Sequence, residues 1–158
     1  MKEIKLANNK GITFIDDEDY EWLNQYKWQL TDTGYAKMAL KGKTKRMHRF
    51  IMKEPDGLQI DHIDGNKLNN QKSNLRFATK SQNAMNSKNR INTTSKFKGV
   101  SKWRNKWFVK IQLNKKQYYL GVFKDENEAA EAYNKVAKEL FGEYAKLNII
   151  KKGDVKNN

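Results

Sequence analysis

The sequence predicts an α+β protein with a β-rich N-terminal segment, a strand–loop–strand–helix unit, and a three-stranded antiparallel sheet packed on one helix. Three observations support this prediction. Short runs of alternating apolar and polar residues recur, Gly and Asn residues separate them, and two helix-capping signals precede helical spacing. A length of 158 residues suits one domain or two small ones. The expected parts are 1–52, 46–89, a linker at 90–96, 97–148 and a tail at 149–158.

The N-terminal segment contains three strand-like runs and one stretch of helical or mixed spacing. Strands are expected at 12–15, 35–40 and 46–52, and the mixed stretch at 20–28. Gly34 and Gly42 mark the turns of hairpins. The pattern indicates a small mixed structure, with Trp22 and Trp28 as core residues.

The central segment begins with a predicted hairpin. The run 58–62 alternates apolar and polar residues and ends in the pair Asp61-His62. Residues 64–66, Asp-Gly-Asn, are a turn signal, and the run 75–77 supplies the second strand.

A capping box predicts that a helix follows this hairpin. Thr79 would be its N-cap and Gln82 its third residue. Asn83 would then lie in the first turn and face the hairpin, with Asn86 one turn later as the alternative. The following stretch, 84–96, is polar, and is either a plain solvated linker or a basic arm that follows a phosphate backbone.

The pair Asp61-His62 indicates hydrolytic chemistry, because one of only two histidines in the chain directly follows an acid. Phosphodiester hydrolysis needs an activated water and a metal that stabilises the developing charge. The carboxylate of Asp61 and the amide oxygen of Asn83 suit Mg²⁺, with Mn²⁺ as the alternative, and His62 is the natural general base. Neighbouring strand residues point to opposite faces, so Asp61 and His62 need a local twist or bulge to converge.

The third part has the clearest periodicity. Strands are expected at 97–103, 106–113 and 117–123, followed by a helix that Asp125 caps and that ends near Gly142. On the middle strand, one face carries Lys106, Phe108, Lys110 and Gln112, and the other carries Trp107, Val109, Ile111 and Leu113. One face therefore packs on the helix, and the other presents cations.

The charge of the chain predicts a polyanionic partner. The net charge is +14 and the pI about 9.8, and residues 65–124 contain fifteen Lys or Arg and no acid. The alternative, a general abundance of Lys and Asn, does not explain why acids are absent from this window but present on both sides of it. The absence of cysteine excludes disulfides and thiolate zinc sites. With no apolar run that could span a bilayer, the expected location is the cytoplasm of a bacterial or phage-infected cell.

The segments "HRFIM", "IDHIDGN" and "SNLRFATKSQN" resemble the HNH (ββα-metal, or His-Me finger) nuclease motif of phage and intron-encoded homing endonucleases. The resemblance implies that Asp61 is the metal carboxylate and His62 the general base. It further implies a role in catalysis for Asn74, which braces the loop between the strands or, as the alternative, takes a direct part in the chemistry. Asn83 would be the second metal ligand, in place of the last histidine of the motif.

Other polar residues of the motif have open roles. His48 either orients the phosphate or packs beside the hairpin, and Arg76 is either a phosphate contact or a surface charge. Asp64, Asn66 and Asn70 are expected to shape the loop.

The third part resembles the ethylene-response-factor (APETALA-type) DNA-binding domain, through Lys98-Gly99-Val100, Tyr119-Leu120-Gly121-Val122-Phe123 and Glu128-Ala129-Ala130 among others. That family lays its sheet in the major groove of double-stranded DNA. The resemblance implies contacts from Lys98, Ser101, Lys110, Gln112 and Tyr119, and from Trp103 or Arg104. Because Lys98, Ser101 and Gln112 stand where the family has arginines, we expect looser base readout and more phosphate contact.

These observations predict a metal-dependent DNA endonuclease of the homing type. One site per chain predicts that a monomer nicks, and that a double-strand break needs a homodimer or sequential cuts. No other protein partner and no membrane is implied. A non-catalytic DNA-binding regulator derived from such a nuclease is the alternative. An RNA-binding protein is a weaker one, since A-form RNA does not offer the groove that the sheet would read.

Overall fold

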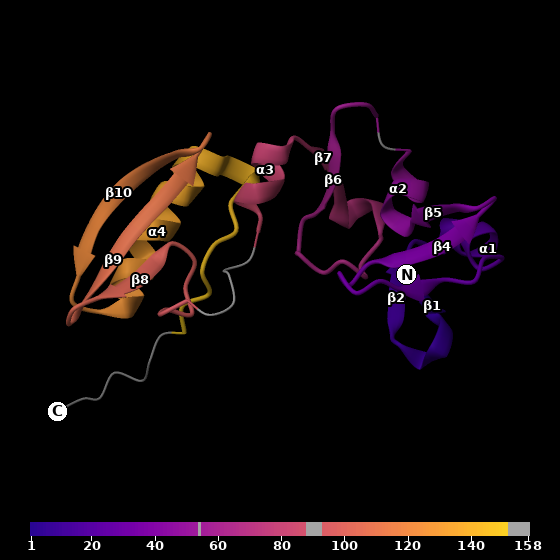
Figure 1. Ribbon diagram of the computed structural model, residues 1–158, viewed down its shortest axis with the longest axis horizontal. Coiled ribbons are helices and arrows are strands. Elements are labelled where there is room, and N and C mark those ends of the chain that lie inside the picture. Colours follow the sequence, from indigo (N-terminus) through magenta and orange to yellow (C-terminus); the bar gives the residue numbers. More distant parts are fainter. Residues whose placement is uncertain (54, 88–92, 152–158) are drawn as a thin grey trace. The chain divides into compact units, whose positions relative to one another are not determined.

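In the computed structural model, residues 1–53, 55–87 and 93–151 are described, and they belong to two compact units (Figure 1). The first unit is Met1–Asn83 and the second is Ala84–Asn158. The division falls inside the predicted segment 46–89. Of the predicted linker and tail, residues 90–92 and 152–158 lie outside the described residues.

The first unit is built from small antiparallel sheets and short helices. Strand β1 (Lys2–Lys5) pairs with β2 (Ile12–Ile15), and β3 (Gln29–Leu30), β4 (Ala36–Leu40) and β5 (Lys43–Arg46) form a second sheet in that order. Lys41 and Gly42, at φ 48° and 73°, form the tight turn between β4 and β5, as the sequence predicted for Gly42.

The predicted strand at 46–52 is wrong, because strand β5 stops at Arg46 and helix α2 (Met47–Met52) follows. Met47 is fully buried, and Phe50 and Ile51 pack against the same core. Positions 47, 50 and 51 are spaced as on one face of a helix, so the buried side has helical periodicity. The mixed stretch 20–28 is helical only in α1 (Tyr20–Leu23), although Trp22 and Trp28 do pack in or against the core.

The hairpin and helix predicted for the central segment are present. Strands β6 (Gln59–His62) and β7 (Leu75–Ala78) are antiparallel, and their loop contains a 3-10 helix (Lys72–Asn74). Helix α3 (Lys80–Met85) begins with the predicted capping box. The Gln82 amide donates to Thr79 Oγ1 at 3.2 Å, and the Thr79 amide donates to Gln82 Oε1 at 2.8 Å.

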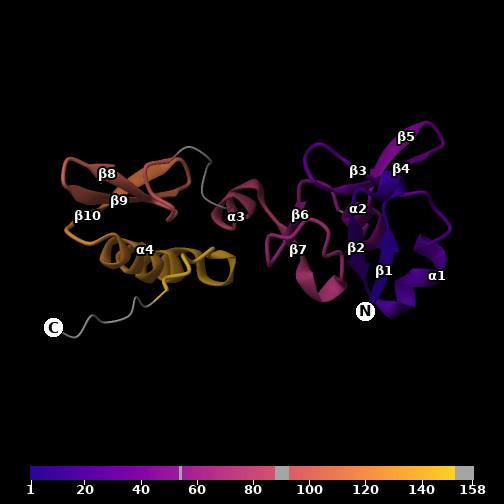
Figure 2. The same ribbon diagram turned by 90° about the horizontal axis from the view of Figure 1, so that it is seen from below.

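The second unit contains one sheet and one long helix. Strands β8 (Val100–Trp103), β9 (Lys106–Leu113) and β10 (Lys116–Phe123) form the sheet with β9 in the centre, and α4 (Glu126–Phe141) covers one face (Figure 2). Asp125 caps α4, since its Oδ1 accepts the amides of Asn127 and Glu128. Among the described residues, no helix is long and apolar enough to cross a membrane.

The two faces of β9 separate as the alternation predicted. Val109 and Ile111 are buried against α4, whereas Lys106, Lys110 and Gln112 are exposed on the other face. Strand β8 begins later than the predicted run 97–103. Just before it, the backbone of Lys98 is bonded to the side chain of Asn148 rather than to a neighbouring strand. Asn148 accepts the amide of Lys98 through Oδ1 and donates to its carbonyl through Nδ2.

Candidate functional site

The register of the β6–β7 hairpin decides which predicted site residues share a face. Asp61 lies opposite Arg76 and His62 opposite Leu75, and the pairing is regular from Gln59 to His62. Alternation therefore places Asp61 and Arg76 on one face and His62 on the other. The described hairpin contains no bulge that would turn Asp61 and His62 to the same side. What brings Asp61 and His62 together is only that they are neighbours at the end of β6.

Asp61 is held by a guanidinium group. Its Oδ2 accepts hydrogen bonds from Arg76 Nε at 3.0 Å and Nη2 at 2.8 Å. Both side chains are largely removed from solvent, with 6% of Asp61 and 12% of Arg76 exposed. Arg76, for which the sequence left phosphate contact or surface charge open, thus makes a partly buried ion pair with the predicted metal carboxylate.

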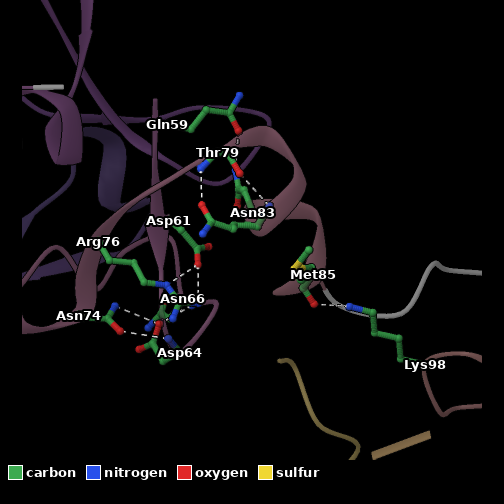
Figure 3. Close-up of polar contacts among 11 residues, drawn as sticks. Gln59, Asp61, Asp64, Asn66, Asn74, Arg76, Thr79, Asn83, Met85 and Lys98 are labelled. Atoms are coloured by element: carbon green, nitrogen blue, oxygen red, sulfur yellow. Dashed lines mark hydrogen bonds and ion pairs between the residues drawn. The ribbon is translucent and has the colours of Figure 1, made fainter. Parts of the chain in front are cut away.

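Asn83 reaches the same face of the hairpin from α3. Its Nδ2 donates to Gln59 Oε1 at 2.8 Å, and Gln59 is two residues before Asp61 on β6 (Figure 3). Because this bond uses the nitrogen end of the amide, the carbonyl oxygen of Asn83 is the end that suits a metal. A carboxylate and an amide oxygen, completed by water, match the preference of Mg²⁺. The described residues contain no group of three or more His, Cys, Asp or Glu that could hold a metal by themselves.

Asn86, the alternative ligand, lies beyond the end of α3 and is buried in the second unit.

His62 is oriented by a chain of buried polar groups. Its Nε2 lies 3.2 Å from Asn70 Oδ1, and Asn70 Nδ2 donates to Thr13 Oγ1 at 2.8 Å. Thr13 in turn donates to the carbonyl of Leu68 at 2.8 Å. Since an amide oxygen only accepts, Nε2 carries the proton in this arrangement, and the lone pair of the neutral ring is on Nδ1.

The surroundings of His62 favour its neutral form. Burial lowers the pKa of His62 below its ordinary value of 6.5, while the hydrogen bond with Asn70 and the carboxylates of Asp64 and Asp61 act in the opposite direction. A neutral imidazole at neutral pH is the form that can accept a proton.

His48 packs against His62 inside the unit. The two ring centroids are 5.0 Å apart, and only 3% of His48 is exposed. Burial, together with the charges of His62, Arg49 and Arg46, lowers the pKa of His48 from 6.5 to about 3. This position corresponds to the packing alternative for His48, rather than to a surface group that meets a phosphate.

Tyr35 is a neighbour of both histidines that the sequence did not indicate. Its ring centroid lies 5.0 Å from that of His48 and 6.0 Å from that of His62. Two cations lie beside the same ring, Arg46 at 5.0 Å and Lys67 at 4.7 Å from its centroid. Two cations therefore lie close to the His62 side of the hairpin.

Asn74 joins the two ends of the loop. Its Nδ2 donates to Asp64 Oδ1 at 3.0 Å, and its Oδ1 accepts the Asp64 amide at 3.0 Å (Figure 3). Its Nδ2 also donates to the Asn69 carbonyl at 2.8 Å. The Asn74 carbonyl also accepts the amide of Ile63. These are the contacts of a brace, and they place Asn74 in the loop rather than beside Asp61.

The N-terminal segment holds this loop from outside. The amide of Phe14 donates to the Leu68 carbonyl, and the amide of Asn70 donates to the Phe14 carbonyl. Lys72 pairs with the acidic turn, through its ammonium to Glu18 and Asp19. Thr13 was missed as a site residue, and Asn70 was expected only to shape the loop. The one available signal for Thr13 was a polar residue at a buried position of the run 12–15.

The predicted DNA-binding residues of the second unit divide into two groups. Lys110, Gln112, Trp103, Arg104 and Tyr119 are exposed and Ser101 is half-buried, and Ser101, Trp103 and Tyr119 line a shallow hollow on the face away from α4. Lys98 differs, because its ammonium donates to the Met85 carbonyl. Burial and the nearby Lys146 lower the pKa of Lys98 from 10.5 to about 8.

Comparison with known proteins identifies the central segment. Residues 48–85 match the family described as HNH endonuclease. A protein of Acanthamoeba polyphaga mimivirus named as an uncharacterized HNH endonuclease is 38% identical over 153 residues, which are 92% of this chain and 79% of that protein. Protein 3.8 of Escherichia phage T7 is 36% identical over 95 residues, covering 59% of this chain and 78% of that protein.

DNA endonuclease I-HmuI of Bacillus phage SP01 is 36% identical over 89 residues, and the match covers about half of each chain. No solved structure matches. The similarity to the mimivirus protein extends over nearly the whole chain, and the family match begins at His48 and includes Asp61, His62, Asn74 and Asn83. The chain therefore belongs to the HNH endonuclease family.

Proposed function

We propose that this protein is a metal-dependent DNA endonuclease in which His62 is the general base and Asp61 and Asn83 hold one divalent ion. The observation that carries the proposal is the chain from His62 through Asn70 to Thr13. A buried amide oxygen that fixes one nitrogen of a histidine leaves the other nitrogen oriented for proton transfer.

His62 would take a proton from the attacking water at Nδ1. Its lowered pKa keeps the ring neutral before the reaction, and the carboxylates of Asp64 and Asp61 favour the imidazolium that forms. His48 and Tyr35 pack against the ring and restrict its rotation. Asn70 acts through His62, and so is a positioning residue.

The divalent ion, Mg²⁺ or Mn²⁺, would stabilise negative charge on the phosphate and on the leaving oxygen. Asp61 and Asn83 offer one carboxylate and one amide oxygen on the same face of the hairpin. This donor set resembles the ββα-metal arrangement. With one such site per chain, a monomer would cut one strand of duplex DNA. A double-strand break would need a homodimer or two successive cuts.

The exposed face of the second unit would bind double-stranded DNA. Lys106 and Lys110 lie on this face, and the rings of Phe108 and Tyr119 stack there at 5.1 Å. The face fits the sheet of an ethylene-response-factor-like domain in a major groove. Lys98 is the exception, since its ammonium is held by a backbone carbonyl.

A plasmid assay tests the chemistry. Wild type with Mg²⁺ should convert supercoiled plasmid to the open circle before the linear form, and chelator should stop it. Asp61→Ala and His62→Ala should each lower the rate by about 10²- to 10⁴-fold. Ser73→Ala, at an exposed position of the same loop, is the matched control and should cut normally. Equal cutting by all four proteins would show that these residues do not form the site.

The salt dependence of binding tests the second unit. Measured with chelator so that no cleavage occurs, Lys110→Gln should weaken binding to all duplexes and reduce the slope of log affinity against log salt by about 1. Lys135→Gln is the control, because Lys135 is exposed on α4, which covers the other face of the sheet. Equal effects of the two substitutions would mean that this face has no special part in binding.

A further inference from the structure

We propose that Arg76 is a positioning residue that occupies Asp61 until DNA arrives, so that the divalent ion and DNA bind cooperatively. In the absence of DNA, the guanidinium would hold the carboxylate. When a backbone phosphate enters, the guanidinium would move to the phosphate and leave Asp61 to the metal. This inference rests on the proposed role of Asp61 as a metal ligand.

The ion pair is built into the hairpin by its register. Asp61 and Arg76 are directly opposed on β6 and β7, and directly opposed side chains of antiparallel strands are close neighbours. Two N–H groups of Arg76, Nε and Nη2, converge on the single oxygen Oδ2 at 3.0 and 2.8 Å. The pairing of the strands keeps the two groups within reach, so only the side chain has to move.

A divalent ion at the same carboxylate would meet this guanidinium. The side chains of Asp61 and Arg76 are 6% and 12% exposed, so water screens their charges weakly. The ion and the guanidinium would repel each other across one carboxylate group. Metal binding without DNA should therefore be weak.

A phosphate provides the guanidinium with another partner. Arginine binds phosphate through two parallel N–H donors, a geometry that lysine does not share. With Arg76 on the phosphate, Asp61 loses its cation in a site largely shielded from water, and the free energy of placing a metal there becomes more favourable. The coupling is reciprocal, so bound metal should also favour DNA binding.

Binding of Mn²⁺ alone, followed by the electron paramagnetic resonance signal of the free ion, measures this coupling. His62→Ala serves as the background, so that a short duplex stays intact. In this background without DNA, Arg76→Gln should bind Mn²⁺ about tenfold more tightly, within the usual range of coupling between sites. Adding the duplex should tighten Mn²⁺ binding strongly when Arg76 is present, and less in Arg76→Gln.

Two further variants control the charge and the fold. Lys80→Gln removes one exposed cation from α3, and should leave Mn²⁺ affinity as in the background. Arg76→Lys keeps the positive charge but loses the two parallel N–H donors of arginine. Its Mn²⁺ affinity should lie between those of the background and of Arg76→Gln. Thermal unfolding checks that each protein is folded, and Arg76→Lys still gives the comparison if Arg76→Gln is not.

The outcomes separate two failures. Suppose that Asp61→Ala in the His62→Ala background loses Mn²⁺ binding. If Arg76→Gln and Arg76→Lys then bind Mn²⁺ without DNA no more tightly than the His62→Ala background does, the inference about Arg76 is wrong while the metal site stands. If Asp61→Ala binds Mn²⁺ as the background does, Asp61 is not a ligand, and both the proposed metal site and the role of Arg76 are overturned.

Discussion

The two units of the chain bury different kinds of side chain. In the second unit, α4 and the sheet enclose an apolar cluster of Phe97, Val100, Val109, Ile111, Ala129, Ala130, Tyr133, Ala137 and Phe141. The first unit has an apolar cluster of its own, but it also buries polar groups around β6: Thr13, His48, Asp61, His62, Asn70 and Asn74. The second unit's interior serves stability, whereas part of the first unit's interior carries the residues of the proposed site.

Burying polar groups is unfavourable unless they find partners. A buried group left without its hydrogen bond costs about 1–3 kcal/mol. In the first unit these groups mostly satisfy one another, as Thr13, Asn70 and His62 do. His48 Nδ1 is one buried atom that has no partner among the described residues. The site is thus held by specific pairs, and the second unit by close packing.

The packing of the second unit can be broken at one glycine. Gly99 has φ +78°, and a Cβ there would lie 2.2 Å from ring carbons of Tyr133 and 2.7 Å from the Lys110 carbonyl oxygen. Gly99→Ala should destabilise this unit by about 3 kcal/mol or more, since strain and overpacking add. Hydrogen exchange followed by mass spectrometry should show lost protection in β9 and α4 and normal protection in β6.

Gly142→Ala is the matched control for this substitution. Gly142 also has positive φ, at +54°, but a Cβ there would meet nothing within 4 Å. It should cost only the backbone strain, about 1–3 kcal/mol. Equal losses at Gly99 and Gly142 would mean that contact with Tyr133 is not what makes Gly99 necessary.

Acidification should destabilise the first unit and leave the second nearly unchanged, because both histidines lie in the first unit. The pKa of His48 is about 3 when folded and 6.5 ordinarily, so the unfolded state binds the proton more readily. Stability is therefore full above pH 6.5 and falls as the pH drops toward 3. Between pH 7 and pH 5 the loss should be about 2 kcal/mol.

Unfolding in urea at pH 7 and pH 5, followed by resolved amide resonances of each unit, measures this loss. The first unit should lose stability and the second should change little over this range. His48→Asn removes the titrating group, and should make the first unit less sensitive to pH even if it lowers stability at pH 7. A first unit with the same pH response after this substitution would contradict the prediction.

The strands and the helix of the second unit were predicted well from the sequence, because local patterns specify them. Alternation on β9 and the capping signal at Asp125 are local patterns, and local patterns fix its strands and helix. In the first unit, Met47, Phe50 and Ile51 lie in a short apolar run that suits either strand or helix. Burial by the rest of the unit decides in favour of a helix.

The candidate site shows a similar limit. Asp61, His62 and Asn83 could be named from residue type and spacing. The bond of Arg76 to Asp61 could not, because it depends on the register of β6 and β7. The bond of Asn70 to His62 depends on Thr13, which is 57 residues before Asn70 in the chain. Contacts between such distant residues leave no periodic signal.

The smallest of these effects concerns Asn70, which accepts a hydrogen bond from the proposed general base. Asn70→Leu removes the acceptor of His62 Nε2 and the donor to Thr13, so the ring should lose its fixed orientation. A group that only orients a catalytic side chain contributes about tenfold to hundredfold, and we expect kcat to fall by about tenfold with KM unchanged. Single-turnover nicking at saturating enzyme measures this step.

Rescue separates positioning by Asn70 from a merely structural role. Asn70→Asp keeps an acceptor for His62 Nε2, so it should recover most of the rate that Asn70→Leu loses, although it also removes the donor to Thr13. Asn66→Asp makes the same charge change in an exposed part of the loop and should leave kcat near wild type. If Asn70→Asp and Asn70→Leu were equally slow while Asn66→Asp was normal, the bond to Thr13 would be the important one. The proposed chemistry of the first unit would then depend on how tightly its N-terminal strand holds the loop.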